Sequence, residues 1–320
     1  MDSRRVEFDL LRGIAAFGIV GCHLLLSPRT ASASALTSFC DLNVGVFGAL
    51  AGFMMFGRTS GGWLEYSWKR TRRILPVYVF WSLIFLCSSA MFQICLEGGI
   101  NPRYGDPHWW PSVIFWGGAS CHLWFLACLL YSQVIVRGLV CVFKGLAAHA
   151  ICGICIVLGL GLILMSVTQD NWWGKYPIRL LAFVITGYGL GALHSDGLIQ
   201  SNLLAFSLIL GALFFHYFIW GSAPDFLNDW VTASGIVLGF AMLRVTGSFG
   251  RIAEVAGRTS MGVYLIHPLY TAVGGVLIRR LFAQPYGLLP ILVDWVLAWL
   301  LAFLTGVLIL RLSRLKRFVE

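Results

Sequence analysis

Ten stretches of this chain are apolar over a length that suffices to cross a lipid bilayer. A helix of about 20 apolar residues spans the hydrocarbon core, and a helix satisfies its own backbone hydrogen bonds where water is absent. The runs lie at 9–27, 38–57, 74–95, 121–143, 148–167, 177–197, 199–220, 230–247, 259–283 and 290–312. The sequence therefore predicts an all-α, polytopic integral membrane protein with about ten transmembrane helices, forming a single domain over residues 1–320.

The shortage of charged residues leads to the same class of protein. Only 12% of the residues are charged and 58% are hydrophobic, whereas soluble domains carry about 25% charged residues. So few ionic side chains do not cover a soluble globule, and a disordered chain needs low hydrophobicity. The net charge of +9 indicates basic loops beside anionic lipid rather than a nucleic-acid partner. Membrane lipids are therefore the expected surroundings.

Lysine and arginine are distributed unequally between the two sides of a ten-span chain. Of the 23 Lys and Arg residues, sixteen fall on the side of the N-terminus and six on the other, with Arg12 inside the first run. Cytoplasmic loops carry the excess of these residues. Both termini are therefore predicted to be cytoplasmic, in a multi-pass protein of the cytoplasmic (inner) membrane. No cleavable signal peptide is expected, because Arg12 interrupts the first apolar run.

The first run carries an acid, a base and an imidazole: Asp9, Arg12 and His23. On an α-helix, Arg12 and His23 differ by about 20° of net rotation and about 16 Å of rise, so they share a face. Asp9 precedes Arg12 by three residues and can pair with it. Ionisable residues inside a membrane helix are costly and commonly functional. The competing interpretation is an ion pair that fixes packing, with His23 hydrogen-bonded to a neighbouring helix.

A basic cluster stands at the cytoplasmic entrance of the third run. Arg70 and Arg73 are separated by three residues and point the same way on a helix, with Arg72 beside them. Guanidinium groups bind phosphate oxygens bidentately, so the pair suits a phosphate-bearing ligand. The competing interpretation is an ordinary basic anchor at the membrane surface.

Two further segments place histidine beside aromatic residues. His122 and Trp124 open the fourth run, where an aromatic belt is the alternative explanation. Tyr264 and His267 are neighbours on one helical face in the ninth run, and Pro268 is expected to kink that helix. An intramembrane histidine also serves as a hydrogen-bonding packing residue, so both interpretations stay open.

Several motifs that define other enzyme classes are absent. The chain has no Walker A sequence, no G-x-G-x-x-G, no H-E-x-x-H and no G-x-S-x-G, which argues against an ATP-driven pump, a dinucleotide enzyme, a zinc protease and an α/β-hydrolase. No metal is expected. Of the nine cysteines, six lie in apolar runs and are interpreted as small buried hydrophobic residues, including the C-x-x-C of Cys152 and Cys155.

In order along the chain, the four segments resemble the membrane acyltransferase family 3, whose members O-acylate surface carbohydrates. The matching residues are those of the family's R-x10-H and R-x-x-R patterns and of two later landmarks: Arg12 and His23, Arg70 and Arg73, His122 and Trp124, Tyr264 and His267. The resemblance spans nearly the whole chain. Two departures stand out. Ala51 replaces a serine that is common at the end of the second helix. The fourth helix also lacks the glutamate of members that carry an extra esterase-like domain, and no such domain is expected here.

The resemblance implies an acyl-CoA donor, with acetyl-CoA the expected form and succinyl or other short acyl groups still open. The implied donor-binding residues are Arg70, Arg73 and Arg72, and the implied catalytic residues are His23, Arg12 and Asp9. His23 would act either as general base or as covalent acyl carrier. The implied substrate or supporting residues are His122, Trp124, Tyr264 and His267.

The expected acceptor is a hydroxyl of a surface or exopolysaccharide glycan or of its lipid-linked oligosaccharide precursor. The external segment with Trp109, Trp110 and Trp116 supplies rings for sugar stacking or forms an interfacial belt. A secondary transporter or exporter of an anionic metabolite is the alternative function, although no internal repeat supports it. A non-catalytic partner of polysaccharide synthesis is a third possibility, and it would tolerate substitution of His23.

Overall fold

In the computed structural model of this protein, the regular elements of the described residues are all helices. The described residues are 5–25, 31–56, 62–97, 110, 122–143, 145–169, 172–197, 201–219, 225–282 and 288–312. The helices are α1 (Val6–Leu25), α2 (Ala31–Phe53), α3 (Trp63–Glu97), α5 (Trp124–Val140), α6 (Ala148–Val167), α7 (Trp172–Ser195), α8 (Asn202–Phe214), the π-helix η3 (Phe215–Ile219), α9 (Asp225–Met242), α10 (Gly247–Leu281) and α11 (Leu288–Arg311).

Each of the ten apolar runs overlaps one α-helix of the described chain, which confirms the all-α prediction. Among the residues that the structure describes, five helices are long and apolar enough to cross a membrane: α3, α6, α7, α10 and α11. Shorter apolar stretches lie at Cys40–Phe53, Trp124–Val140 and Asn202–Tyr217. The structure thus describes a helical protein with several candidate membrane spans, while the count of ten spans and the side of the termini stay predictions.

Two helices begin well before the apolar runs that predicted them. The third run was expected from residue 74 and the ninth from 259, but α3 starts at Trp63 and α10 at Gly247. Each of the two extra segments carries one ion pair on the helix surface. Lys69 Nζ lies 2.5 Å from Glu65 Oε1, and Arg258 lies 2.7 Å from Glu254. An apolar run predicts the apolar part of a helix, but it does not predict the residue at which a polar extension of that helix begins.

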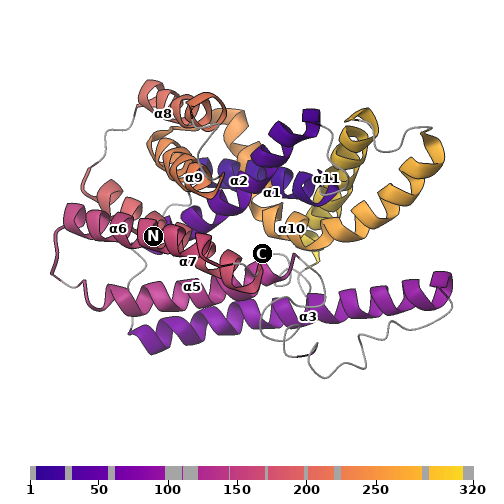
Figure 1. Cartoon of the computed structure of the whole chain (residues 1–320), viewed down its shortest axis with the longest axis horizontal. Coiled ribbons are helices and arrows are strands. Elements are labelled where there is room, and N and C mark those ends of the chain that lie inside the picture. Colours follow the sequence, from indigo (N-terminus) through magenta and orange to yellow (C-terminus); the bar gives the residue numbers. More distant parts are fainter. Residues whose placement is uncertain are drawn as a thin grey trace.

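The helices pack so that α1 lies between α2 and α10, and α7 packs against α6, α2 and α5. Figure 1 shows α3 along one side of the molecule with α5 beside it, and α10 and α11 at the end away from α6. Trp295 of α11 joins α1 through its Nε1, which donates to the carbonyl of Phe17 at 2.8 Å, and its ring stacks on the Phe17 ring. Because α10 packs against both α1 and α11, these three helices form one group.

Glycines allow α2 and α7 to approach closely. A Cβ atom on Gly52 would overlap the carbonyl of Val184, and a Cβ on Gly187 would overlap the carbonyl of Ala49. Small residues at a membrane helix interface permit such contact between backbones. Ala51 lies next to this contact and is only partly buried. The helices α2 and α7 are therefore closely packed, and α1 packs against α2.

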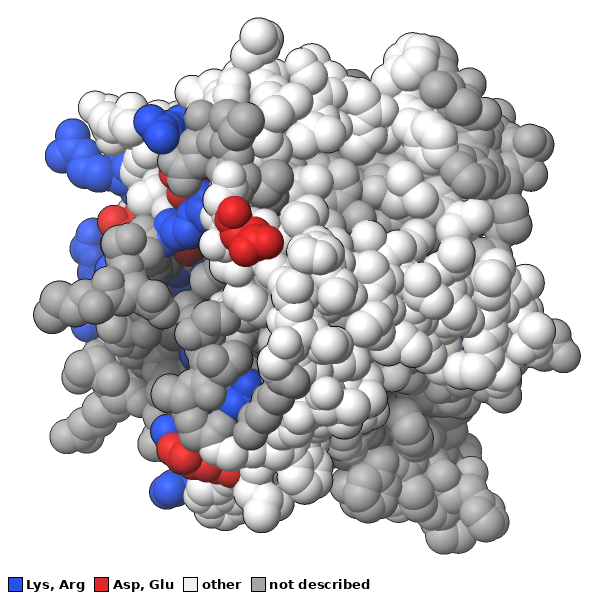
Figure 2. Space-filling model, turned by 90° about the vertical axis from the view of Figure 1, so that its left-hand side faces the viewer, with Lys and Arg blue, Asp and Glu red and all other residues white. Residues whose placement is uncertain are grey.

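Apolar side chains cover much of the outer surface. Large hydrophobic residues are exposed along the helices that include α3, α6, α8, α10 and α11, such as Leu83, Val157, Leu210, Val273 and Leu304. Figure 2 shows one face on which charged side chains gather along the left-hand edge, while most of the other described surface carries no charge. Soluble monomers rarely expose apolar areas this continuous. The surface is that of a protein in contact with lipid.

Arg5 ties the start of α1 to two other helices. Its guanidinium donates to the Ala241 carbonyl at 2.7 Å and lies 2.8 Å from Nε2 of His194. Burial lowers the pKa of Arg5, and the nearby carboxylate of Glu7 opposes that shift. These contacts fix the N-terminal end of α1, the helix that carries Asp9, Arg12 and His23.

Candidate active site

The imidazole rings of His23, His122 and His267 lie together, although they come from three separate segments. His23 is in the last turn of α1, His122 lies in the turn before α5, and His267 lies within α10. The ring centroids are 4.9 Å apart for His23–His267, 6.0 Å for His23–His122 and 5.7 Å for His122–His267. His23 is partly exposed, whereas the other two are buried. The His23 imidazole is therefore the accessible member of the cluster, and the His122 and His267 imidazoles are enclosed by protein.

The hydrogen bonding of His267 fixes its tautomer. Its Nδ1 lies 3.1 Å from the carbonyl oxygen of Val263, one turn earlier in α10. A carbonyl only accepts, so Nδ1 donates and the neutral ring keeps the lone pair on Nε2. That Nε2 is buried and has no hydrogen-bond partner among the described residues. Because buried polar atoms usually have partners, Nε2 of His267 is a ready acceptor inside the cluster.

Tyr264 holds the turn that carries His122 against α10. The Tyr264 hydroxyl donates to the carbonyl of His122, and its ring lies 5.5 Å from that of Phe125. On another side the His122 ring packs edge-on against Phe85 of α3 at 4.7 Å. Tyr264 is thus a support for His122, and the helices α3, α5 and α10 all contribute to holding the cluster.

Asp9 and Arg12 lie on the same helix as His23, nearer the start of α1. The Arg12 Nη1 donates to Asp9 Oδ1 at 3.2 Å, and Asp9 is 1% exposed while Arg12 is 33% exposed. A Cβ atom on Gly257 of α10 would overlap the Asp9 side chain, so this glycine makes room for the carboxylate. The pair expected from the spacing is formed, with its carboxylate between α1 and α10 and its guanidinium facing outward.

The arginines of α3 gather around aromatic rings. Arg70 donates from Nε to the hydroxyl of Tyr66 at 3.1 Å, and its guanidinium carbon lies 5.3 Å from the Tyr66 ring centre. Arg137 of α5 lies 5.6 Å from the same ring. Arg72 stacks instead on Trp68 at 5.5 Å, and Arg73 is exposed. Two guanidinium groups from different helices therefore meet at Tyr66.

In chemical terms, a partly exposed imidazole beside a second imidazole with a free lone pair suits acid–base or nucleophilic catalysis. Two arginines at one tyrosine suit the binding of an anion. No group of three or more His, Cys, Asp and Glu is arranged to hold a metal ion in the part of the chain that the structure describes.

The comparison with protein families agrees with this arrangement. Residues 5–311 match the model of acyltransferase family 3, described as an acyltransferase domain. The chain belongs to this acyltransferase family. The match covers nearly the whole chain and confirms the resemblance seen in the sequence. Comparisons with curated proteins and with solved structures gave no match. The protein is therefore a membrane acyltransferase, and its donor and acceptor are matters for proposal.

The acyltransferase brings together three of the residues that sequence analysis singled out, but not all of them. His23, His122 and His267 converge, with Tyr264 beside His122. Trp124 packs against Tyr176 of α7 at 5.5 Å and is not one of the rings in the histidine cluster. Of the external tryptophans, Trp110 is exposed, whereas 109 and 116 lie outside the described residues.

Two buried charged residues of the acyltransferase escaped the sequence analysis. Arg137 is 7% exposed and joins Arg70 at Tyr66, although its position near the end of an apolar run suggested only a basic loop. Asp294 of α11 is 4% exposed, and its Oδ1 has no hydrogen-bond partner among the described residues. A carboxylate inside an apolar run is itself a signal, and it would have pointed to Asp294.

Proposed function

We propose that this acyltransferase moves an acetyl or other short acyl group from cytoplasmic acyl-CoA to a hydroxyl of a surface or exopolysaccharide glycan, or of its lipid-linked precursor. The observation that carries the proposal is the contact between His23 and His267 in a chain that belongs to the acyltransferase family. An imidazole with an unprotonated neighbour is suited to take the proton of a hydroxyl nucleophile.

The donor binds at the arginines of α3. Coenzyme A carries phosphate groups, and the guanidinium of Arg70, with Arg137 beside it at Tyr66, offers charge-assisted hydrogen bonds to phosphate oxygens. Arg73 and Arg72 lie within one turn and add positive charge around the same end of α3. Acetyl-CoA is the preferred donor in this proposal, and the pantetheine arm extends from the arginines toward His23.

Transfer takes place at His23. The acceptor hydroxyl loses its proton to the imidazole as its oxygen attacks the thioester carbonyl, and the thiolate of coenzyme A leaves and recovers that proton. Alternatively, His23 accepts the acyl group first and passes it to the hydroxyl, with the same overall balance. In either case His267 positions the His23 ring, while Asp9 and Arg12 shape the part of α1 below it.

The orientation of the proposal follows the distribution of lysine and arginine, with both termini in the cytoplasm and the acceptor reached from the opposite side. A fluorescent protein fused to the C-terminus is expected to fold and fluoresce in the cytoplasm. An exported alkaline phosphatase fused at the same place is expected to be inactive. The reverse pair of results would place the C-terminus on the opposite side and contradict the proposed orientation.

Native membranes that contain the acceptor provide the functional test. Membranes from cells that express the wild-type protein, His23→Ala or Arg70→Ala at equal levels are incubated with radiolabelled acetyl-CoA, and the label in the glycan fraction is counted. At acetyl-CoA concentrations below the KM, the proposal expects transfer by the wild type, loss of transfer in His23→Ala and weaker transfer in Arg70→Ala. Equal transfer by His23→Ala would overturn the role of the histidine cluster, and equal transfer by Arg70→Ala would overturn the donor site.

A further inference from the structure

A second polar cluster, made of residues other than the three histidines, joins Ser38 of α2, His216 of η3 and Asp229 of α9. The Ser38 Oγ lies 2.9 Å from Nε2 of His216. On the other side of the ring, Nδ1 of His216 lies 3.9 Å from Oδ1 of Asp229. Residues from three helices thus form a series of hydroxyl, imidazole and carboxylate, in the order that activates a serine.

The imidazole of His216 is held firmly by its surroundings. His216 is 5% exposed, its carbonyl accepts a hydrogen bond from Asn228 Nδ2 at 2.9 Å, and the Thr232 hydroxyl lies 3.5 Å from its Nδ1. His216 also belongs to a π-helix, a rare element that often marks a functional site. With the proton on Nδ1, on the side of the Asp229 carboxylate, the lone pair of Nε2 accepts the hydrogen bond from Ser38.

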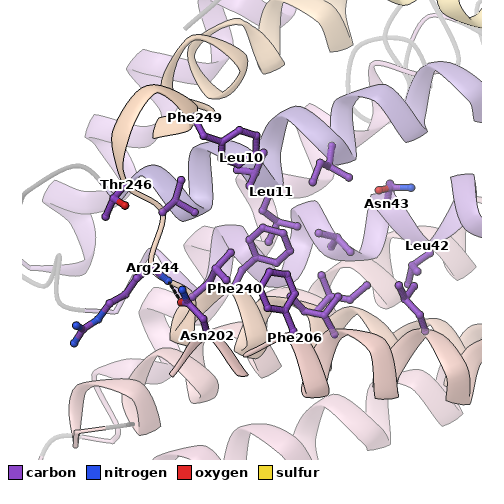
Figure 3. Close-up of a pocket in the computed structure, with 17 residues that line it drawn as sticks. Leu10, Leu11, Leu42, Asn43, Asn202, Phe206, Phe240, Arg244, Thr246 and Phe249 are labelled. Carbon is purple, nitrogen blue, oxygen red and sulfur yellow. Dashed lines mark hydrogen bonds between the residues drawn. The ribbon is translucent and has the colours of Figure 1, made fainter. Parts of the chain in front are cut away.

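An apolar groove adjoins this cluster. It has a volume of about 600 Å³ and is lined by residues of α1, α2, α8, α9 and the start of α10. Figure 3 shows its aromatic wall, where Phe206 and Phe240 face one another, and its polar end at Asn202, Arg244 and Thr246. The remaining lining is almost entirely aliphatic or aromatic, which suits a hydrocarbon chain.

The walls of the groove continue into the polar cluster. Leu42 lines the groove on α2, and Ser38 lies one helical turn before it on the same face. Leu213 lines the groove on α8, and His216 follows three residues later. Along α8, the lining extends from Asn202 to Leu213, about 16 Å at the rise of an α-helix. Ser38 and His216 therefore lie within about one helical turn of lining residues of a groove that is long enough for an extended acyl chain.

We infer that Ser38, His216 and Asp229 form a second nucleophilic site that accepts the acyl group of a long-chain carboxylic ester, whose hydrocarbon chain occupies the groove. Ser38 is the nucleophile, His216 takes and returns its proton, and Asp229 orients His216. This site differs from the proposed transfer site at His23 in both its residues and its substrate class, and it does not depend on that proposal.

The reaction balances without any redox partner. The Ser38 oxygen bonds to the ester carbonyl carbon and gives its proton to Nε2 of His216. The bond between that carbon and the alcohol oxygen then breaks, and the alcohol leaves with the proton from His216. Water attacks the acyl-serine ester by the same path, which releases the fatty acid and restores Ser38.

An alkyl fluorophosphonate tests the nucleophile directly, because an activated serine displaces its fluoride and keeps the phosphonyl group. The purified full-length protein is treated with a dodecyl probe, and the modified peptide is identified by mass spectrometry. We expect labelling at Ser38, no labelling there in Ser38→Ala, and labelling slowed roughly 100-fold or more in His216→Gln, which keeps a hydrogen-bonding group but takes no proton. Ser260→Ala and His149→Gln serve as matched controls that keep the wild-type rate.

Further variants separate this site from the transfer site and test the groove. His23→Ala is expected to keep full labelling of Ser38, whatever its effect on acyl transfer. Leu213→Trp is expected to slow the dodecyl probe while leaving an ethyl probe unaffected. No time-dependent labelling of Ser38 in folded wild-type protein, or an equal rate in folded His216→Gln, would overturn the nucleophilic site. Equal rates of the two probes in the wild type would overturn the groove as the place of the chain.

Discussion

The imidazole rings of His23 and His267 lie 4.9 Å apart, although the two residues belong to helices near opposite ends of the chain. Their contact depends on close packing of α1 against α10, where Asp9 lies against Gly257 and Gly13 against Ala256. His23 is the more exposed of the pair. In our proposal His23 therefore contacts the substrate, and His267 positions His23.

His267→Gln is expected to lower acyl transfer roughly tenfold to hundredfold, because glutamine cannot share the proton of His23. The measurement is the rate of glycan labelling across a range of pH. A positioning role predicts that the acid limb of the pH profile moves, whereas a structural defect would lower the rate equally at every pH. His149→Gln, at an exposed histidine, is the control. An unchanged rate and profile in His267→Gln would contradict the assignment.

Arg70→Ala is expected to raise the KM for acetyl-CoA roughly 10- to 100-fold, since a hydrogen bond to a charged group is worth about 1.5–3 kcal/mol. Because Arg70 binds the donor and not the reacting atoms in our proposal, kcat should change little. Arg137→Ala is expected to act in the same direction. The control is Arg258→Ala, which removes an exposed arginine paired with Glu254. A change in kcat alone would argue against a donor site.

Gly274→Ala is expected to destabilise the folded protein by about 1–3 kcal/mol, the usual cost of overpacking. A Cβ atom on Gly274 would overlap the buried carboxylate of Asp294, whereas a Cβ on Gly275 meets nothing within 4 Å. Gly275→Ala is thus a matched control at the next residue. Thermal unfolding in one detergent compares the two, and equal melting temperatures would show that α10 and α11 do not pack as described.

Asp9→Asn is expected to cost about 1–3 kcal/mol of stability, because it leaves the Arg12 guanidinium without its carboxylate beside a tightly packed helix. Glu65→Gln removes a carboxylate whose ion pair with Lys69 is solvent-exposed, and exposed pairs contribute little. Thermal unfolding should therefore distinguish the two variants. A melting temperature for Asp9→Asn that equals that of Glu65→Gln would contradict a structural role for the Asp9–Arg12 pair.

Sequence periodicity predicted the positions of the helices and the pairing of Asp9 with Arg12, because both depend on spacing within one helix. It also singled out the three histidines, since a polar residue within an apolar run is conspicuous. Their convergence did not follow from any local pattern. It depends on which helices pack together, and the glycines that permit this packing look like any other small residues in the sequence.

The second polar cluster, too, could not be predicted from local sequence patterns. Ser38, His216 and Asp229 are separated by long stretches of chain, and no motif connects them. The π-helix that carries His216 has no distinctive sequence either. Arg137 was counted only as a basic residue near the end of a run, because its burial against Tyr66 comes from the packing of α5 on α3. The burial and the polar neighbours of these residues depend on tertiary contacts alone.

The most direct test of the central claim uses purified protein and radiolabelled acetyl-CoA, with the wild type beside His23→Ala. The account predicts that the wild type releases free coenzyme A or becomes labelled itself, and that folded His23→Ala does neither. Equal release by the two proteins would contradict the role of His23. Absence of binding and turnover in both, with other short acyl-CoA donors failing as well, would contradict acyl-CoA as the donor.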